Sequence, residues 1–100
     1  MNFEYTPELI EYIQEKKLKS LVVEVIEANH TDIEFTDIRV HFVNKRMAEI
    51  FKTERKYRSV TTEYGEVLLP RYKLEYDDTV TFGLKKVFLF KSVTCNGIRL

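Results

Sequence analysis

One change of pattern constrains the fold of this chain more than any other feature. The segment Thr6-Pro7-Glu8 predicts a helix start, because Thr accepts from free amides, Pro suits the first turn and Glu complements the positive helix end. The predicted helix runs from Pro7 to Lys17, with apolar residues at helical spacing. Beyond it the chain becomes rich in β-branched and alternating segments. One helix followed by strands predicts an α+β domain.

Two long extended segments follow the predicted helix. Ser20–Ala28 is dense in β-branched residues, and Ile33–Val43 alternates apolar residues on one face with polar residues on the other. The polar stretch Asn29–Asp32 between them predicts a turn. Within the second segment, Thr36-Asp37 predicts a bulge or a further turn.

The basic stretch Asn44–Lys56 fits either a short helix or an irregular loop. Asn44 suits a helix cap, and Met47, Ile50 and Phe51 are spaced like one face of a helix. The sequence therefore predicts a short second helix here, with a loop as the alternative.

The remainder of the chain is predicted to be all-β. The expected strands are Tyr57–Thr62, Val67–Leu69, Tyr72–Tyr76, Thr79–Phe82 and Val87–Cys95. Turns are expected at Glu63–Gly65, Asp77-Asp78 and Asn96-Gly97. The predicted architecture is an N-terminal helix packed on a mainly antiparallel β core.

The apolar segment Val87–Phe90, followed by Val93, invites pairing with another copy if it lies at a sheet edge. Lys85, Lys86 and Lys91 flank this segment and would oppose such pairing. Both a monomer and a homodimer therefore fit the sequence.

Length and composition fit one globular domain spanning residues 1–100. The chain is 44% hydrophobic and 32% charged, values typical of a folded domain. Its single cysteine cannot form an internal disulfide, which suits the reducing cytoplasm. No signal peptide is visible, and no apolar stretch is long enough to span a bilayer. We therefore expect a cytoplasmic protein with no membrane partner.

Four segments of the chain carry a recognisable pattern: TPELIEYIQEKK at the start, LVVEVIEA, TEYGEVLLP and the ending LKKVFLFKSVTCNGIRL. In this order they resemble the HesB-like domain family, the fold of the A-type iron–sulfur carriers. The closer resemblance is to the small HesB-like proteins with a Cys-Cys or Cys-selenocysteine motif. The resemblance implies a short helix before the first strand, a Gly-bearing hairpin in mid-chain, and an apolar strand leading into Gly-Ile.

The cysteines that such proteins use as ligands are absent from this chain. Ala28-Asn29-His30 stands where the paired cysteines follow the first strand, and Cys95-Asn96-Gly97 stands where the carriers have Cys-Gly-Cys. The resemblance therefore implies the fold without a cluster-binding site, and we expect no cofactor.

Few residues with reactive side chains are available for catalysis or for binding a metal ion. Cys95, His30 and His41 are the only thiol and imidazoles, and they lie far apart without metal-ligand spacing. Glu24, on an otherwise apolar strand, is either a half-exposed strand residue or a partly buried acid with a raised pKa. Asp77-Asp78 fits a turn. We therefore predict no catalytic residues, no metal site and no enzymatic activity.

One basic segment is the best candidate for contact with a partner. Its cations are interleaved with Met47, Phe51 and Tyr57, as in some nucleic-acid surfaces. An isoelectric point near 6.7 is unlike that of a dedicated nucleic-acid binder, and a solvated surface is the alternative. The residues of this candidate contact are Lys45, Arg46, Lys52, Arg55, Lys56 and Arg58.

The sequence thus predicts a small non-enzymatic binding or adaptor module, with a protein as the expected partner. Two alternatives remain open. One is a metal or iron–sulfur accessory protein that uses His30 and Cys95 across a dimer. The other is nucleic-acid contact through Lys45–Arg58.

Overall fold

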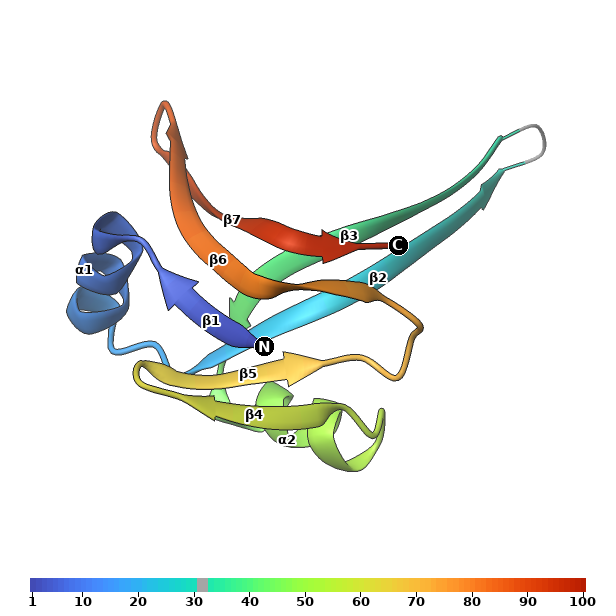
Figure 1. The fold of residues 1–100 in the computed structure, drawn as a ribbon, viewed down its shortest axis with the longest axis horizontal. Coiled ribbons are helices and arrows are strands. Elements are labelled where there is room, and N and C mark those ends of the chain that lie inside the picture. The colour runs from blue at the N-terminus through green and yellow to red at the C-terminus, as the bar shows by residue number, and fades with distance from the viewer. Residues whose placement is uncertain (31–32) are drawn as a thin grey trace.

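The computed structural model describes the backbone of residues 1–30 and 33–100 and the side chains of residues 1–27 and 36–100. The described chain forms two helices and seven strands (Figure 1). In chain order they are β1 (Asn2–Tyr5), α1 (Pro7–Lys16), β2 (Ser20–His30), β3 (Ile33–Val43), α2 (Lys45–Thr53), β4 (Arg58–Thr62), β5 (Gly65–Leu69), β6 (Glu75–Val87) and β7 (Phe90–Arg99). The predicted α+β class is confirmed.

The strands form two sheets of mixed direction. The smaller sheet has the order β1-β6-β7, and the larger has the order β3-β2-β5-β4. Strands β1 and β6 pair in parallel, as do β2 and β5, whereas β2–β3, β4–β5 and β6–β7 are antiparallel. Three of the five pairings are antiparallel, as predicted, and two are parallel, because these two join strands that are separated by long stretches of chain.

The main core lies between the two sheets and is closed by α1. Leu21 and Val23 of β2 face Phe82 of β6 in this cluster, with Leu9 of α1 beside them. The opposite face of β2 packs on α2 through Val22, which is fully buried. The start of β2 is thus covered on both faces, which explains the consecutive apolar residues Leu21–Val23.

Both helices begin at the predicted caps. The Thr6 hydroxyl accepts from the amide of Leu9 at 3.4 Å, and α1 ends where Lys17 adopts a left-handed φ of 55°. The Asn44 carboxamide oxygen accepts from the amide of Met47 at 2.8 Å. The helical interpretation of the basic stretch is therefore confirmed, and the loop alternative is wrong.

Three strand predictions need correction. Residues Asn2–Tyr5 form an unpredicted strand, because β6 offers them a parallel partner. The predicted continuous strand Val87–Cys95 contains the turn of a hairpin, since Val87 pairs with Phe90. The predicted strand Tyr72–Tyr76 begins only at Glu75.

Three turn predictions are also wrong. Thr36-Asp37 lies within uninterrupted pairing of β2 and β3. Asp77-Asp78 falls in a register irregularity inside β6, and Asn96-Gly97 lies within β7 opposite it. Gly97 has a φ of 100°, and a Cβ there would approach the Thr79 carbonyl oxygen to 2.7 Å. The glycine thus serves an irregular strand pair rather than a hairpin turn. The predicted turn Asn29–Asp32 lies partly outside the described residues.

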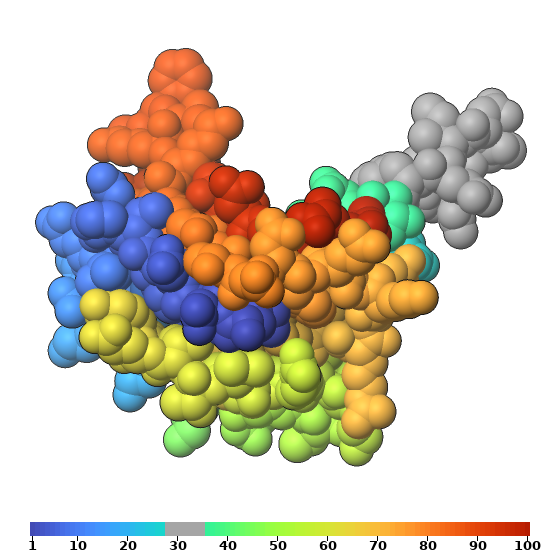
Figure 2. Space-filling model, in the orientation of Figure 1, coloured from blue at the N-terminus to red at the C-terminus, as the bar shows by residue number. Residues whose placement is uncertain are grey.

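The β6–β7 hairpin extends beyond the two sheets. Figure 1 shows it rising past α1, and Figure 2 shows its end as a separate projection from the body.

Among the helices that the structure describes, none is long and apolar enough to cross a membrane.

Candidate functional site

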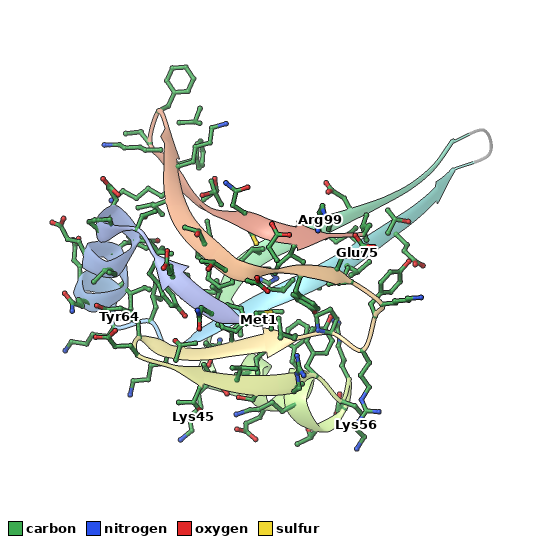
Figure 3. The ribbon with its side chains drawn as sticks, viewed as in Figure 1. Met1, Lys45, Lys56, Tyr64, Glu75 and Arg99 are labelled. Atoms are coloured by element: carbon green, nitrogen blue, oxygen red, sulfur yellow. The ribbon has the colours of Figure 1, made fainter. Side chains whose placement is uncertain are left out.

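The six cations of the basic segment have different surroundings. Lys52 Nζ lies 3.2 Å from carboxylate oxygens of both Glu49 and Glu66. The Arg55 guanidinium lies 4.5 Å from the centre of the Phe51 ring. Figure 3 shows Lys45 and Lys56 on the side of the molecule that carries α2, and well apart from each other. Two of the six cations are therefore engaged within the protein, and the predicted partner contact at this segment stays a prediction.

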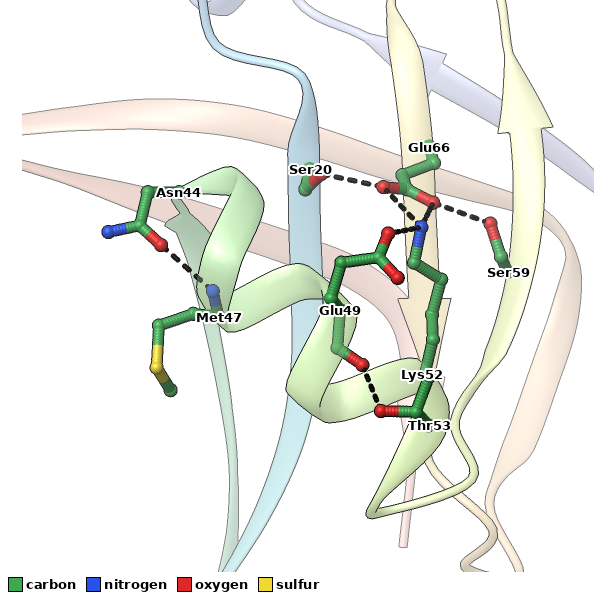
Figure 4. Close-up of polar contacts among 8 residues, drawn as sticks. All are labelled: Ser20, Asn44, Met47, Glu49, Lys52, Thr53, Ser59 and Glu66. Carbon is green, nitrogen blue, oxygen red and sulfur yellow. Dashed lines mark hydrogen bonds and ion pairs between the residues drawn. The ribbon is translucent and has the colours of Figure 1, made fainter.

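A polar network around Glu66 joins four elements (Figure 4). Its carboxylate accepts from the hydroxyls of Ser20 in β2 and Ser59 in β4, each at 2.7 Å, and from Lys52 in α2. Burial is the largest single influence on the pKa of Glu66 and raises it, but these hydrogen bonds and the Lys52 charge together outweigh burial and lower the pKa. The network holds α2 on the sheet.

Replacing Glu66 by Gln is expected to lower the free energy of unfolding at pH 7 by about 1–2 kcal/mol. A lowered folded-state pKa gives stability that is present above the ordinary pKa of 4.5 and is lost as pH falls through the folded value. The difference between the two proteins should therefore shrink on acidification, which urea unfolding at several pH values measures. Glu49→Gln is the control, because that side chain is 57% exposed, against 22% for Glu66. Equal losses in both variants would contradict the prediction.

Glu24, His41 and Arg55 form a second polar cluster. His41 Nε2 lies 2.9 Å from one oxygen of Glu24, and Arg55 lies 3.8 Å from the other. The Glu24 side chain is 23% exposed, so this acid is half-buried and has two partners. The sequence placed Glu24 and His41 on strands but gave no sign that they meet.

Cys95 lies away from this cluster. It is half-buried on β7, packs against the main core, and burial raises its pKa to about 11. The thiol form therefore predominates at neutral pH, which disfavours both nucleophilic attack and metal binding. His41 follows the core-facing Val40 and so points to the other face of its sheet. The His30 side chain lies outside the described residues.

Clustered metal ligands are not found among the described side chains, 1–27 and 36–100: no three of His, Cys, Asp and Glu lie close enough to hold an ion.

Asp77, predicted as a turn former, instead accepts a hydrogen bond from Arg99 at 2.6 Å across the strand pair.

The end of the β6–β7 hairpin carries consecutive exposed apolar side chains. Phe88, Leu89 and Phe90 are 89%, 93% and 78% exposed, and Val87 is 45% exposed. Elsewhere, each phenylalanine with a described side chain is buried or half-buried. The sequence KKVFLFK does not predict a turn here, since it contains no Gly, Asn, Asp or Pro. We call residues 87–90 the hairpin tip.

Phe88 has an unusual backbone conformation for its residue type. Its φ is 55°, in the left-handed region that glycine adopts readily and bulky residues rarely adopt. A non-glycine residue there costs about 1–2 kcal/mol. Lys17 and Lys56 share this φ, but Phe88 is the bulky aromatic residue of the three. Strain of this kind clusters at functional sites, which makes Phe88 a candidate functional residue.

A hollow of about 670 Å³ lies between the link from α1 to β2 and the start of α2. Lys17, Lys19 and Lys45 stand around it, and the Glu66 network forms part of its wall. Every buried side-chain polar atom in the described part of the chain has a hydrogen-bond partner. The hollow therefore has no unpaired buried group to select a ligand.

No family model matches this chain, and neither a curated protein nor a solved structure matches it. The resemblance to the HesB-like domain therefore stays a prediction from the four sequence segments.

Proposed function

We propose that the protein is a non-enzymatic binding module that contacts its partner through the hairpin tip. The observation that supports this proposal is the exposure of three large apolar side chains in a row, Phe88–Phe90, at the end of a projecting hairpin. Contiguous apolar surface on a folded domain marks sites of contact with other molecules. Aromatic side chains are also the usual anchors of such contacts.

The strain at Phe88 supports the same proposal. Glycine would meet the backbone requirement of the turn without cost. The phenylalanine there makes the turn less favourable and leaves its own ring in water. Both penalties are offset if the ring is buried against a partner.

The other functions considered from the sequence receive less support. Cys95 is held as a thiol, so the accessory role with His30 has no specific observation in its favour. In the segment Lys45–Arg58, which was considered for nucleic-acid contact, Lys52 and Arg55 form ion pairs within the protein, and these pairs neutralise part of the positive charge. By contrast, the side chains of the hairpin tip are exposed and therefore available to a partner.

Photocrosslinking in cells that make the protein tests the proposal. Benzoylphenylalanine at position 89 should give a discrete adduct, with either a protein or a lipid, because this side chain is 93% exposed at the tip. The same group in place of Tyr72, which is 42% exposed in the loop between β5 and β6, is the control. Adducts equally abundant at both positions, or absent from position 89, would contradict the proposal.

A further inference from the structure

The hairpin tip combines an apolar end with a cationic collar. Lys85 and Lys86 precede the tip, Lys91 follows it, and residues 79–100 contain no acid at all. We infer that the partner is an anionic membrane surface, and this inference rests on the proposed function. Phe88–Phe90 insert at the level of the lipid headgroups, and the three lysines contact the headgroup charges.

The shape of the hairpin suits a flat, fluid surface. The tip is the convex end of a projection, and its apolar side chains stand at the extreme of the hairpin (Figures 2 and 3). A protein partner would need a pocket complementary to this end, whereas a bilayer interface accepts apolar side chains without a preformed cavity. The expectation of no membrane partner rests on the lack of a spanning segment, and an interfacial tip needs none.

The placement of the lysines favours an external anion. Lys86 lies directly opposite Lys91 in the strand pair, and like charges in that arrangement destabilise a hairpin. The Lys91 ammonium lies 5.2 Å from the centre of the Tyr12 ring. No ion pair within the described residues involves Lys85, Lys86 or Lys91. Lys91 is engaged by the Tyr12 ring, whereas the charges of Lys85 and Lys86 are available to lipid phosphates and carboxylates.

Acidic side chains of α1 lie beside this collar. Glu8, Glu11 and Glu15 of α1 line a hollow together with Lys86 and Lys91. Helix α1 lies at the base of the hairpin, and the tip extends beyond it (Figure 1). The tip therefore reaches a surface before the acids do, and the acids limit how deeply the domain approaches it.

A single tryptophan reports insertion, because the natural chain contains none. In Leu89→Trp, we expect a blue shift of fluorescence and co-sedimentation with vesicles of phosphatidylcholine and phosphatidylserine, but not with phosphatidylcholine alone. Tyr72→Trp is the control and should show no shift when bound. A shift of equal size at both positions, or no binding to anionic vesicles by the folded protein, overturns the inference.

Two variants separate the parts of the inference. Phe88→Gly should weaken vesicle binding about tenfold or more, while thermal stability stays equal or rises as strain is relieved.

Reversal of Lys85, Lys86 and Lys91 to Glu should weaken vesicle binding about a hundredfold. Reversal of Lys45, Arg46 and Lys56 is the control with the same change of net charge. Similar losses from both reversals overturn the specific role of the collar.

The outcome also distinguishes this inference from the proposed function. A tip-dependent photoadduct with a protein, or tip-dependent dimers in solution, combined with no vesicle binding, overturns the membrane inference and leaves the binding module in place. Absence of vesicle binding together with absence of any adduct at position 89 overturns both.

Discussion

Replacing Phe82 by Ala should cost about 3–5 kcal/mol of folding free energy, the largest loss that we expect from any single core substitution here. The Phe82 side chain is fully buried. Its ring stacks on Phe3 at 5.7 Å between centroids and meets Tyr5 at the same distance. The substitution therefore removes contacts to β1 as well as the packing of β6 against the other sheet, and leaves a cavity that rigid strands cannot close.

Urea unfolding followed by circular dichroism measures this loss. Phe90→Ala is the matched control, because it makes the same change on the same hairpin at a side chain that is 78% exposed. The control should change the free energy of unfolding by less than about 0.5 kcal/mol. Comparable losses in the two variants would show that Phe82 does not belong to the principal core.

Local signals in the sequence were sufficient to predict the helices. Thr6 and Asn44 are side chains that accept from free amides, and each begins a helix as expected. The dense β-branched run after Ser20 likewise predicted a strand. These features depend on neighbours within a few residues, so they can be identified before the tertiary structure is known.

Features that depend on distant segments could not be predicted in this way. Asn2–Tyr5 becomes a strand only because β6 lies beside it, and Glu66 finds Ser20 at a separation of 46 residues. The register irregularity that accommodates Asp77-Asp78 depends on Gly97 across the strand pair. In each case a tertiary contact determines the local conformation, and a window of sequence does not contain the partner.

The candidate site was missed for a related reason. Apolar residues at Val87–Phe90 predicted the first part of one continuous strand, Val87–Cys95, rather than the end of a hairpin. The hairpin turn there lacks the residues that ordinarily mark turns, and Phe88 adopts a φ of 55°. The conflict between local preference and observed conformation is the signal that distinguishes this segment from the core strands.

Replacing Gly65 by Ala is expected to destabilise the protein by at least about 2 kcal/mol, by combining a backbone clash with backbone strain. Gly65 has a φ of 126°, and a Cβ there would clash with the carbonyl oxygen of Lys19. That same oxygen accepts from the amide of Glu66 at 2.8 Å, at the start of the parallel pairing of β2 and β5. The methyl group can be accommodated only if β5 moves away from β2.

Urea unfolding and amide hydrogen exchange together test this prediction. The Glu66 amide should exchange faster in the Gly65→Ala variant, because its bond to Lys19 is the first to be stretched. Glu63→Ala is the control, since this exposed residue lies in the same turn. A Gly65→Ala protein of unchanged stability with a protected Glu66 amide would mean that the approach of β5 to β2 is looser than described. If only the exchange rate rises, the strain is absorbed locally, and the pairing of β2 with β5 does not depend on a glycine at this position.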